Sequence, residues 1–359
     1  MNVLLVNSAA PALWGGGEKW FVEAAEWLRG QGAQVTIVAR PASQLLHRAQ
    51  SKTIATIAFG FGGDFDPLAM LRAKKVVRET GAHVVVTNFN KESWQFGIAG
   101  KFVSVPVLAR HGFTLWTNKP HHRWLAARIL TGVVVNAQSI ADHYARHNIV
   151  PQRLDVVANG VKIAAHKPGR LRAELGLSQD ALLLVAAGRL ETQKRFDKLL
   201  RCAAELRQHL PFTLAIFGVG PHDSELRAQC EVLQIGDLVK WRGFDEELAD
   251  KVGDADLFLL TSDSEGTPNA ALEAMAAGVP VLGFDVGNMA EILNGELSTF
   301  LIPAGRDELF VERLHGICAN RAALHTVRQA FRERAINEFS FERSMQRYWR
   351  ILLETTERS

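Results

Sequence analysis

The chain has 359 residues, of which 47% are hydrophobic and 22% charged, and its formal net charge is +3. This composition is typical of a globular protein, the length favours two domains over a single core, and no run is long and apolar enough to span a bilayer. Cys202, Cys230 and Cys318 are far apart and follow no metal-binding or redox spacing, which favours buried thiols in a reducing cytosol. No basic segment precedes the first apolar residues, so we expect no signal peptide and a cytoplasmic location.

The charge is distributed unevenly along the chain. Residues 1–163 carry 18 Lys and Arg against 9 Asp and Glu, a net +9, whereas residues 164–359 carry 23 against 29, a net −6. Between Ser93 and Ala141 there is no acidic residue. A basic half favours an anionic partner or a membrane surface, but scattered solvated lysines and arginines explain it equally well.

The first half alternates apolar strands with helices. It opens with a strand at Asn2–Asn7, a loop to Gly15-Gly16-Gly17 and a helix at Glu18–Arg29 with apolar residues at helical spacing. Strand, glycine-rich loop and helix in this order usually begin a doubly wound sheet, although the dinucleotide fingerprint is absent. The other predicted elements here are strands at Gln34–Ala39, Thr53–Ala58, His83–Thr87, Val105–Ala109, Gly132–Asn136 and Leu154–Ala158, and helices at Pro67–Glu79 and Gln138–His147.

A second α/β half follows a predicted linker at 159–169. Its alternation of strands and helices implies a mostly parallel sheet, so the predicted fold class is α/β with two doubly wound domains that face each other across a cleft. The predicted strands are Ala181–Ala187, Phe212–Phe217, Leu238–Trp241, Leu257–Thr261 and Val279–Gly283, and the helices are Arg170–Leu175, Phe196–His209, Asp223–Gln234, Glu246–Val252, Glu308–Ala319 and Ala322–Ile336. A last helix at Phe341–Leu353 has one strongly apolar face, which needs a groove to lie in.

The segment between Glu265 and Glu273 is the strongest candidate for a site. A Gly-Thr-Pro turn and a helix predicted at Ala270–Ala277 follow Glu265, and Asn269 is expected to cap that helix. A loop carboxylate can accept hydrogen bonds from sugar hydroxyls, and a helix N-terminus can bind a phosphate. The segment could therefore hold both ends of a nucleotide sugar, whereas the plainer interpretation is a surface helix with two solvated glutamates.

Taken together, these features resemble a retaining GT-B glycosyltransferase of family four over nearly the whole chain. The motifs that carry the resemblance are Gly15-Gly16-Gly17-Glu18, His111-Gly112, Asn159-Gly160-Val161, Gly188-Arg189-Leu190 with Gln193-Lys194, Gly218-Val219-Gly220-Pro221, and Glu265 with Glu273. Lys162 stands where the family often has aspartate, Arg195 where it has glycine, and Pro268 where a second glycine is frequent. Because proline has no N–H, one backbone donor to the substrate is missing at Pro268.

The resemblance implies three parts and an activity. Residues 1–163 would form an acceptor-binding domain, residues 164–338 a donor-binding domain, both Rossmann-like, and residues 339–359 a helix that packs back on the first domain. The implied activity is transfer of a hexose from a UDP-sugar or GDP-sugar to a glycan or lipid-linked envelope acceptor of the lipopolysaccharide or exopolysaccharide type. The implied mechanism is retaining and needs neither a metal nor another cofactor.

The resemblance also implies roles for individual residues. Arg189 and Lys194 would hold the diphosphate and neutralise the leaving group. Glu265 would bind hydroxyls of the donor sugar, Glu273 would accept from both ribose hydroxyls, and His111 would contact the transferred sugar. The simpler alternatives are a surface salt bridge for Arg189 and a core or capping histidine for His111. The remaining donor contacts would come from Gly16, Gly17, Gly188, Gly218, Gly243, Gly266, Thr267 and Asn269. No protein nucleophile is assigned, and Lys194→Ala is expected to cost catalysis with little loss of stability.

Candidate acceptor contacts lie in the basic half, mostly in predicted loops. Tryptophan stacks on sugar rings and also sits well at a membrane interface, although plain core packing is the alternative. The candidates are Trp14, Trp116, His121 and Arg123, near Trp94 and Trp124. We expect peripheral contact with an anionic membrane at its cytoplasmic face and, because no recognised motif is present, no nucleic-acid partner. A nucleotide-sugar epimerase and a non-catalytic glycan-binding relative stay open as alternatives.

Overall fold

The computed structural model describes residues 1–163 and 168–357, and its chain forms two compact units. The first unit comprises Met1–Ala158 and the C-terminal segment from Ser344, and the second comprises Asn159–Arg343. The boundary predicted between residues 163 and 164 borders segment 164–167, which lies outside the described residues, as do residues 358 and 359 at the C-terminus.

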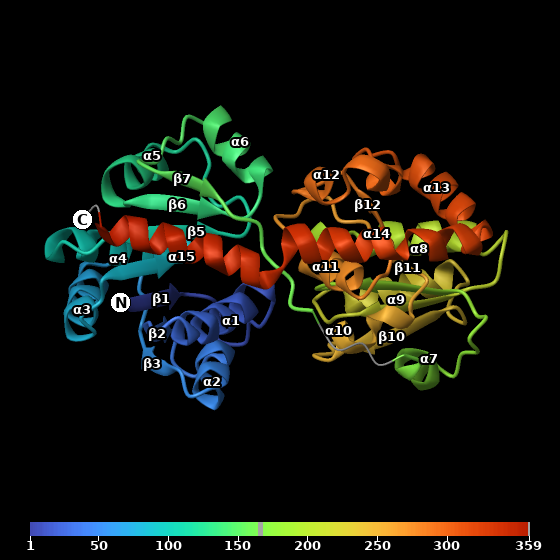
Figure 1. Ribbon diagram of the computed structural model, residues 1–359, viewed down its shortest axis with the longest axis horizontal. Coiled ribbons are helices and arrows are strands. Elements are labelled where there is room, and N and C mark those ends of the chain that lie inside the picture. Colours follow the sequence, from blue (N-terminus) through green and yellow to red (C-terminus); the bar gives the residue numbers. More distant parts are fainter. Residues whose placement is uncertain (164–167, 358–359) are drawn as a thin grey trace. The chain divides into compact units, whose positions relative to one another are not determined.

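The first unit is built on a seven-stranded parallel sheet in the order β3-β2-β1-β4-β5-β6-β7 (Figure 1). Its strands are β1 (Asn2–Asn7), β2 (Gln34–Ala39), β3 (Ala55–Ala58), β4 (Val84–Thr87), β5 (Val107–His111), β6 (Gly132–Val135) and β7 (Leu154–Val156). Its helices are α1 (Gly16–Gly30), α2 (Gln44–Ser51), α3 (Pro67–Glu79), α4 (Asn90–Val103), α5 (Pro120–Trp124), which a π-turn at Leu125–Ile129 continues, and α6 (Gln138–Arg146). The order of the strands reverses between β1 and β4.

Helix α15 (Phe341–Glu357) covers part of the first unit with the apolar face that the sequence predicts (Figure 1). Met345, Tyr348 and Leu352 are buried, and the Tyr348 ring meets the ring of Trp20 on α1 at a centroid distance of 5.1 Å. The Ser344 hydroxyl donates to the Ala158 carbonyl at 2.7 Å. The groove that this helix requires is therefore present on the first unit.

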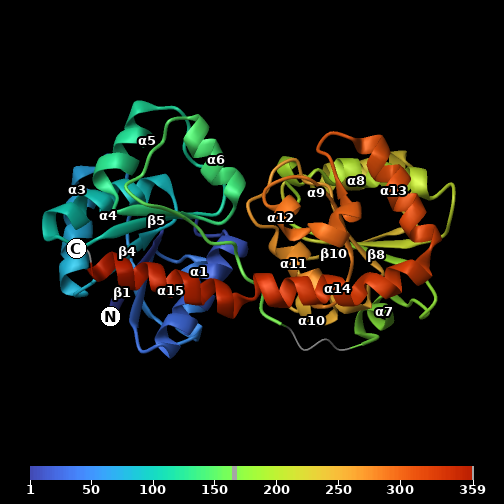
Figure 2. The ribbon, with the colours of Figure 1, turned by 45° about the horizontal axis from the view of Figure 1, so that its top comes forward.

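The second unit holds a six-stranded parallel sheet in the order β10-β9-β8-β11-β12-β13. Its strands are β8 (Leu183–Ala187), β9 (Thr213–Phe217), β10 (Val239–Gly243), β11 (Leu257–Leu260), β12 (Val281–Phe284) and β13 (Leu301–Ile302). Its helices are α7 (Arg170–Leu175), α8 (Phe196–Leu206), α9 (Asp223–Val232), α10 (Leu248–Lys251), α11 (Asn269–Ala276), α12 (Met289–Ile292), α13 (Asp307–Ala319) and α14 (Arg321–Phe339), with 3₁₀ turns at Thr192–Lys194, Val252–Asp254 and Gly295–Phe300. Helix α14 packs against α11 (Figure 2).

Three sequence-based expectations about local structure are wrong. Gly16 and Gly17 form the first turn of α1 instead of the preceding loop, with Gly15 at the N-cap. Asn269 does not cap its helix, because Pro268 occupies the N-cap and the Asn269 amide is engaged elsewhere. Of the residues expected mostly in loops of the basic half, Trp94 lies on α4, and His121, Arg123 and Trp124 lie on α5.

Candidate functional site

The second unit has its topological switch point between β8 and β11, where the strand order reverses. In open parallel sheets, loops at the carboxyl ends of the two strands beside such a point diverge and leave room for a ligand. The loop after β8 contains Arg189 and Lys194, and the loop after β11 contains Glu265 and leads into α11. Sequence motifs that lie far apart in the chain thus meet at one place.

Lys194 and Glu265 form an ion pair across this switch point. The Lys194 Nζ lies 2.6 Å from Glu265 Oε1, and the two side chains are 23% and 6% exposed. The hydroxyl of Ser262, itself buried, donates to the same Oε1 at 2.7 Å. Both bonds converge on one oxygen, so Oε2 is the oxygen of Glu265 that can accept from a sugar hydroxyl. The sequence analysis did not name Ser262, although its position three residues before Glu265 places it on the same loop.

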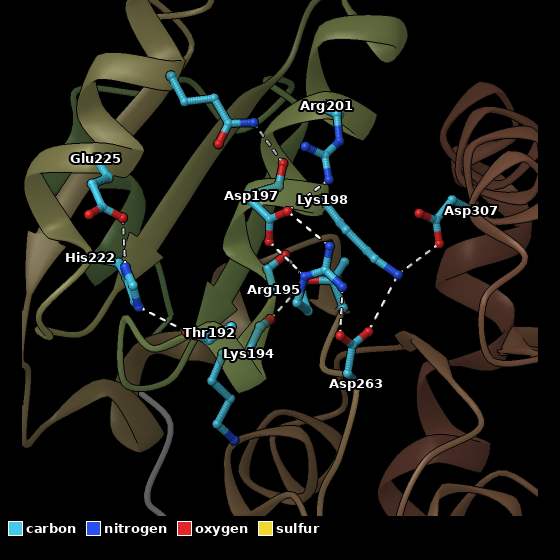
Figure 3. Close-up of polar contacts among 12 residues, drawn as sticks. Thr192, Lys194, Arg195, Asp197, Lys198, Arg201, His222, Glu225, Asp263 and Asp307 are labelled. Atoms are coloured by element: carbon cyan, nitrogen blue, oxygen red, sulfur yellow. Dashed lines mark hydrogen bonds and ion pairs between the residues drawn. The ribbon is translucent and has the colours of Figure 1, made fainter.

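Further contacts bind the loop after β8 to the loop after β11. The Asp263 N–H donates to the Gln193 carbonyl at 2.9 Å, and the Gln193 side chain donates to the Ser264 carbonyl at 2.5 Å. Figure 3 shows Arg195 between Asp197 and Asp263. The two loops therefore form one bonded structure.

Glycines let the loops after β8 and β9 pack backbone against backbone. Gly218 has φ of +143°, and a Cβ there would lie 1.8 Å from the Gly188 carbonyl oxygen. A Cβ at Gly220 would lie 2.4 Å from the Leu190 carbonyl oxygen. The Gly218 N–H also donates to the Gly243 carbonyl at 2.7 Å, which joins the end of β10 to the same group. Side chains at Gly218 and Gly220 would separate these loops.

The turn before α11 is held by asparagines that sequence analysis did not assign to the site. The Asn288 N–H donates to the Gly266 carbonyl at 3.1 Å, and the Asn288 amide donates to the Thr267 hydroxyl at 3.3 Å. The Asn159 amide donates to Asn269 Oδ1 at 3.0 Å. Only the presence of Asn159 in the Asn-Gly-Val motif could have pointed to this role.

Arg189 and Glu273, also predicted to bind the sugar donor, lie at the same edge of the sheet of the second unit. Arg189 is half-exposed, and its guanidinium lies 3.0 Å from Glu191, so the salt bridge considered as an alternative is present. Glu273 is half-buried and lies one turn into α11. The structure thus groups Arg189, Lys194, Glu265 and Glu273 on the loops and helix that follow β8 and β11.

His111 ends β5 in the first unit and is fully buried. Its Nδ1 lies 2.7 Å from the Tyr144 hydroxyl, and its ring packs edge-on against Trp116. Among the described residues, Nε2 has no hydrogen-bond partner. Burial, together with the nearby charge of Arg110, lowers the pKa of His111 to about 3, so the imidazole is neutral at physiological pH.

At the switch point of the first unit, between β1 and β4, Glu92 bonds to the loops that follow both strands. Its carboxylate accepts from the Phe89 N–H at 2.7 Å, the Ser8 N–H at 3.2 Å and the Ser8 hydroxyl. These bonds join the loop after β1 to the N-terminus of α4. Burial raises the pKa of Glu92, although hydrogen bonds to the carboxylate oppose the shift.

Two family models together match most of the chain. The model described as Glycosyltransferase Family 4 matches residues 14–165, and the model described as Glycosyl transferases group 1 matches residues 169–338. The chain belongs to glycosyltransferase family 4. Both matches carry the motifs on which the resemblance was argued.

Similarity to individual proteins agrees with this family. A D-inositol 3-phosphate glycosyltransferase from Frankia alni is 36% identical over 44% of this chain and 42% of its own length. A putative colanic acid biosynthesis glycosyltransferase, WcaL of Escherichia coli, is 29% identical over 45% of this chain and 41% of its own. The chain therefore spans less than half the length of these curated relatives.

Similarity to a solved structure establishes the fold. The structure of HepE from Anabaena in complex with UDP-glucose superposes with a TM-score of 0.84 and 20% identity over 100% of both chains. The predicted fold class, two Rossmann-like domains of the GT-B type, is confirmed.

Not every predicted acceptor residue of this family-4 chain is accessible. Trp116 is fully buried, and its indole N–H donates to Asn90 Oδ1 at 3.0 Å, so its ring belongs to the core of the first unit. The Arg48 guanidinium lies over the ring of half-buried Trp14 at 4.3 Å from the centroid. His121 and Arg123 lie half-buried on α5. The structure does not gather these four side chains into one cluster.

A different aromatic surface is open in the first unit. A groove of about 500 Å³ lies between α4, α5 and the loop before α3. It is lined by Phe65, Trp94, Ile98, Pro120, His121 and Trp124. Trp124 is half-exposed and stacks on Trp94, whose buried indole nitrogen has no hydrogen-bond partner among the described residues.

Residues 1–163 and 168–357 contain neither a membrane-spanning helix nor a metal-binding cluster of side chains. None of the helices found there combines the length and apolar character needed to cross a membrane. The same residues hold no group of three or more His, Cys, Asp or Glu side chains arranged to bind a metal ion.

Proposed function

We propose that this protein is a glycosyltransferase that moves a hexose from a nucleotide diphosphate sugar to an acceptor, with the donor held by the second unit. The observation that carries the proposal is the Lys194–Glu265 ion pair, which joins the loops after β8 and β11 at the switch point, four residues before α11 begins. The family match supports the activity, and the complex of HepE with UDP-glucose supports UDP as the nucleotide of the donor.

In this proposal, cationic side chains hold the donor diphosphate. An ammonium group has three donors, so Lys194 can bind phosphate oxygens while it holds Glu265. Arg189 is half-exposed, and the ion pair that it forms within the described residues is with Glu191, two positions further along the same loop, so its guanidinium can turn to the diphosphate. Free N–H groups at the start of α11 add positive potential. These charges stabilise the departing nucleotide in the role that a metal ion has in other transferases.

Glu265 and Glu273 would bind the two sugar rings of the donor. Glu265 has Oε2 available to hydroxyls of the transferred sugar, and Glu273 would accept from the ribose. Gly16, Gly17, Gly188, Gly218, Gly243, Gly266, Thr267 and Asn269 are proposed as further donor contacts. In the first unit, His111 is proposed to contact the transferred sugar. With Nδ1 accepting from the Tyr144 hydroxyl, Nε2 would carry the ring N–H. Because His111 is fully buried, this N–H would donate to a sugar oxygen only after the side chains that cover the ring move.

We further propose that the reaction retains the anomeric configuration without a metal ion. Attack and departure on the same face of the sugar, with the leaving phosphate as base, need no protein nucleophile. The chemistry of the donor set supports this, because Lys194 and Arg189 provide the positive charge at the diphosphate. NMR analysis of the product anomer, in buffer with EDTA, tests both points: an inverted product or loss of turnover would contradict them.

The proposed acceptor is a glycan or a lipid-linked envelope glycan, reached at the cytoplasmic face of a membrane by the first unit. The relatives named for D-inositol 3-phosphate and for colanic acid biosynthesis support a polyhydroxylated acceptor. The absence of acidic residues from Ser93 to Ala141, together with the aromatic groove, supports contact with an anionic membrane. Sedimentation with anionic and neutral vesicles at low and high salt tests the membrane contact, which is excluded if anionic vesicles fail to bind the protein at low salt.

Calorimetric titration with UDP, GDP, UDP-glucose and GDP-mannose tests the donor proposal. We expect one nucleotide family to bind and to raise the melting temperature. Incubation with the donor alone, followed by NMR, separates the alternatives: a new epimer would identify an epimerase. Tight binding without turnover on any glycan acceptor would identify a non-catalytic relative, and no binding of any nucleotide would refute the proposal.

A further inference from the structure

Arg195, directly after Lys194, has a left-handed backbone with φ of +51°. Glycine adopts this conformation without strain, whereas a residue with a Cβ does so at a cost. The family resemblance expects glycine here, and this chain has arginine. Arginine at this position makes side-chain contacts that a glycine could not make.

The Arg195 guanidinium binds two carboxylates. It forms a bidentate ion pair with Asp197, in which Nε and Nη2 donate to the two carboxylate oxygens at 2.9 and 3.0 Å. Its Nη1 donates to Asp263 at 2.6 Å. Lys198 lies 3.4 Å from Asp263 and 3.1 Å from Asp307 (Figure 3). Asp197 fixes the guanidinium on α8, the element that follows Arg195, and Asp263 belongs to the loop after β11.

This ion pair lies next to the residues proposed to bind the donor. Arg195 is one residue after Lys194, and Asp263 is two residues before Glu265. The Thr261 hydroxyl lies 3.1 Å from the Arg195 carbonyl oxygen and donates to it, so backbone and side chain of Arg195 both hold the loop after β11. In Figure 3 the Lys194 side chain extends away from Arg195, which leaves its ammonium outside the ion-pair network.

We propose that Arg195 and Asp263 are positioning residues: their ion pair holds the loops after β8 and β11 at a fixed separation, so that Lys194 and Glu265 are preorganised for a nucleotide diphosphate sugar. This inference rests on the proposed function of the same site. If the two loops are already fixed relative to each other before the donor binds, the entropic cost of binding is smaller. The arginine compensates for the glycine that the chain lacks by adding a side-chain link between the loops.

Calorimetric titration of the full chain with UDP, and with GDP in parallel, tests the positioning role of the Arg195–Asp263 ion pair. We compare the wild type with Arg195→Gly, Arg195→Lys, Asp263→Asn and the double variant Arg195→Gly/Asp263→Asn. Asp237→Asn is the matched control, because Asp237 forms an Arg–Asp pair with Arg207 and is 62% exposed, against 50% for Asp263.

We expect Arg195→Gly and Asp263→Asn each to weaken UDP binding about tenfold. Asp263→Asn also removes the ion pair to Lys198. The double variant should therefore bind no more weakly than Asp263→Asn alone, since Arg195→Gly removes a link that Asp263→Asn has already broken. Arg195→Lys should retain part of the affinity, and Asp237→Asn all of it. Uridine binding should change little in any variant, because uridine has no phosphate. The melting temperature of Arg195→Gly should also change little, because glycine relieves the backbone strain at this position.

The outcomes separate this inference from the proposed function. Suppose that the wild type binds UDP or GDP and the variants bind it equally well, or that the losses of affinity add in the double variant. The positioning role of Arg195 and Asp263 is then wrong, and the proposed function stands. If the wild type binds no nucleotide diphosphate, the proposed function fails, and the positioning role of Arg195 and Asp263 fails with it. If Arg195→Gly does not fold, Asp263→Asn and Arg195→Lys still decide the question.

Discussion

Replacing Lys194 by methionine gives the sharpest test of the site, since methionine keeps an unbranched side chain only one atom shorter than lysine and removes its charge. The change leaves the Glu265 carboxylate, 6% exposed, with the Ser262 hydroxyl as its remaining donor among the contacts described above. Breaking a buried pair from one side costs roughly 3–5 kcal/mol. Because Lys194 is 23% exposed and Ser262 stays, we expect a smaller loss, about 2 kcal/mol.

This expectation revises the one from sequence alone, which predicted little loss of stability. For a domain of this size, a loss of 1 kcal/mol lowers the melting temperature by roughly 2–4 °C. The double variant Lys194→Met/Glu265→Gln removes both charges and should recover most of the stability. Thermal unfolding of the wild type and both variants measures this, and equal melting temperatures in all three would show that the ion pair contributes nothing.

The same variant should lose affinity for the diphosphate. A hydrogen bond to a charged group contributes about 1.5–3 kcal/mol, so UDP binding should weaken roughly 10- to 150-fold. Uridine, which lacks phosphates, should bind Lys194→Met as it binds the wild type. Calorimetric titration with both ligands decides the matter: an unchanged affinity for UDP, or an equal loss for uridine, would refute the placement of Lys194 at the diphosphate.

Two further predictions concern backbone space and pH. Gly287 has φ of +63°, and a Cβ there would lie 2.3 Å from the Gly266 carbonyl oxygen, whereas Gly295 has φ of +60° and open space around it. Gly287→Ala should therefore lower the free energy of unfolding by about 3 kcal/mol and weaken UDP binding. The control Gly295→Ala should lower it by about 1 kcal/mol and leave UDP binding intact, as measured by urea unfolding and calorimetric titration. The pKa of His111 is lowered to about 3, so the unfolded chain takes up a proton below pH 6.5 that the folded chain does not, and stability falls as the pH drops from 6.5 toward 3. In His111→Asn this part of the loss, up to about 1.4 kcal/mol per pH unit, should disappear, and parallel urea-unfolding profiles from pH 7 to 4.5 would contradict the assignment.

Local sequence signals predicted several elements at their observed residues. The helices Pro67–Glu79 and Arg170–Leu175 and the strands Asn2–Asn7 and Gln34–Ala39 lie at the predicted residues. Caps and stop signals define such ends: Asp66 accepts from two N–H groups of α3, and Gly176 ends α7 in a left-handed conformation.

Helix α4 was missed because it has no polar face to reveal its period. Trp94, Gln95 and Phe96 are all buried, and two glycines lie in tight contacts. A Cβ at Gly97 would lie 2.7 Å from the Ile129 side chain, and one at Gly100 2.5 Å from the Val107 side chain. A helix surrounded by protein shows no apolar period, and its glycines read as turn signals.

The candidate site shows the same division between local and tertiary information. The residue types and the spacing between Glu265 and Glu273 predicted a sugar- and phosphate-binding segment, which stays a prediction, but the cap at Asn269 and the exposure of Trp116 were misjudged. Asn269 bonds to Asn159, 110 positions earlier in the chain, and Trp116 packs on His111 in the core. Partners so distant in sequence leave no local signal.

By itself, the sequence determined the alternation of strands and helices and the parallel character of both sheets, and it supplied the candidate residues for a nucleotide-sugar site, because apolar periodicity and side-chain chemistry are local properties. Only the tertiary structure decided that β8 lies beside β11, since the neighbour of a strand in a sheet is chosen by packing and by crossover connections, not by the strand's own residues. That adjacency places Lys194 against Glu265, 71 positions away, and Arg195 against Asp263.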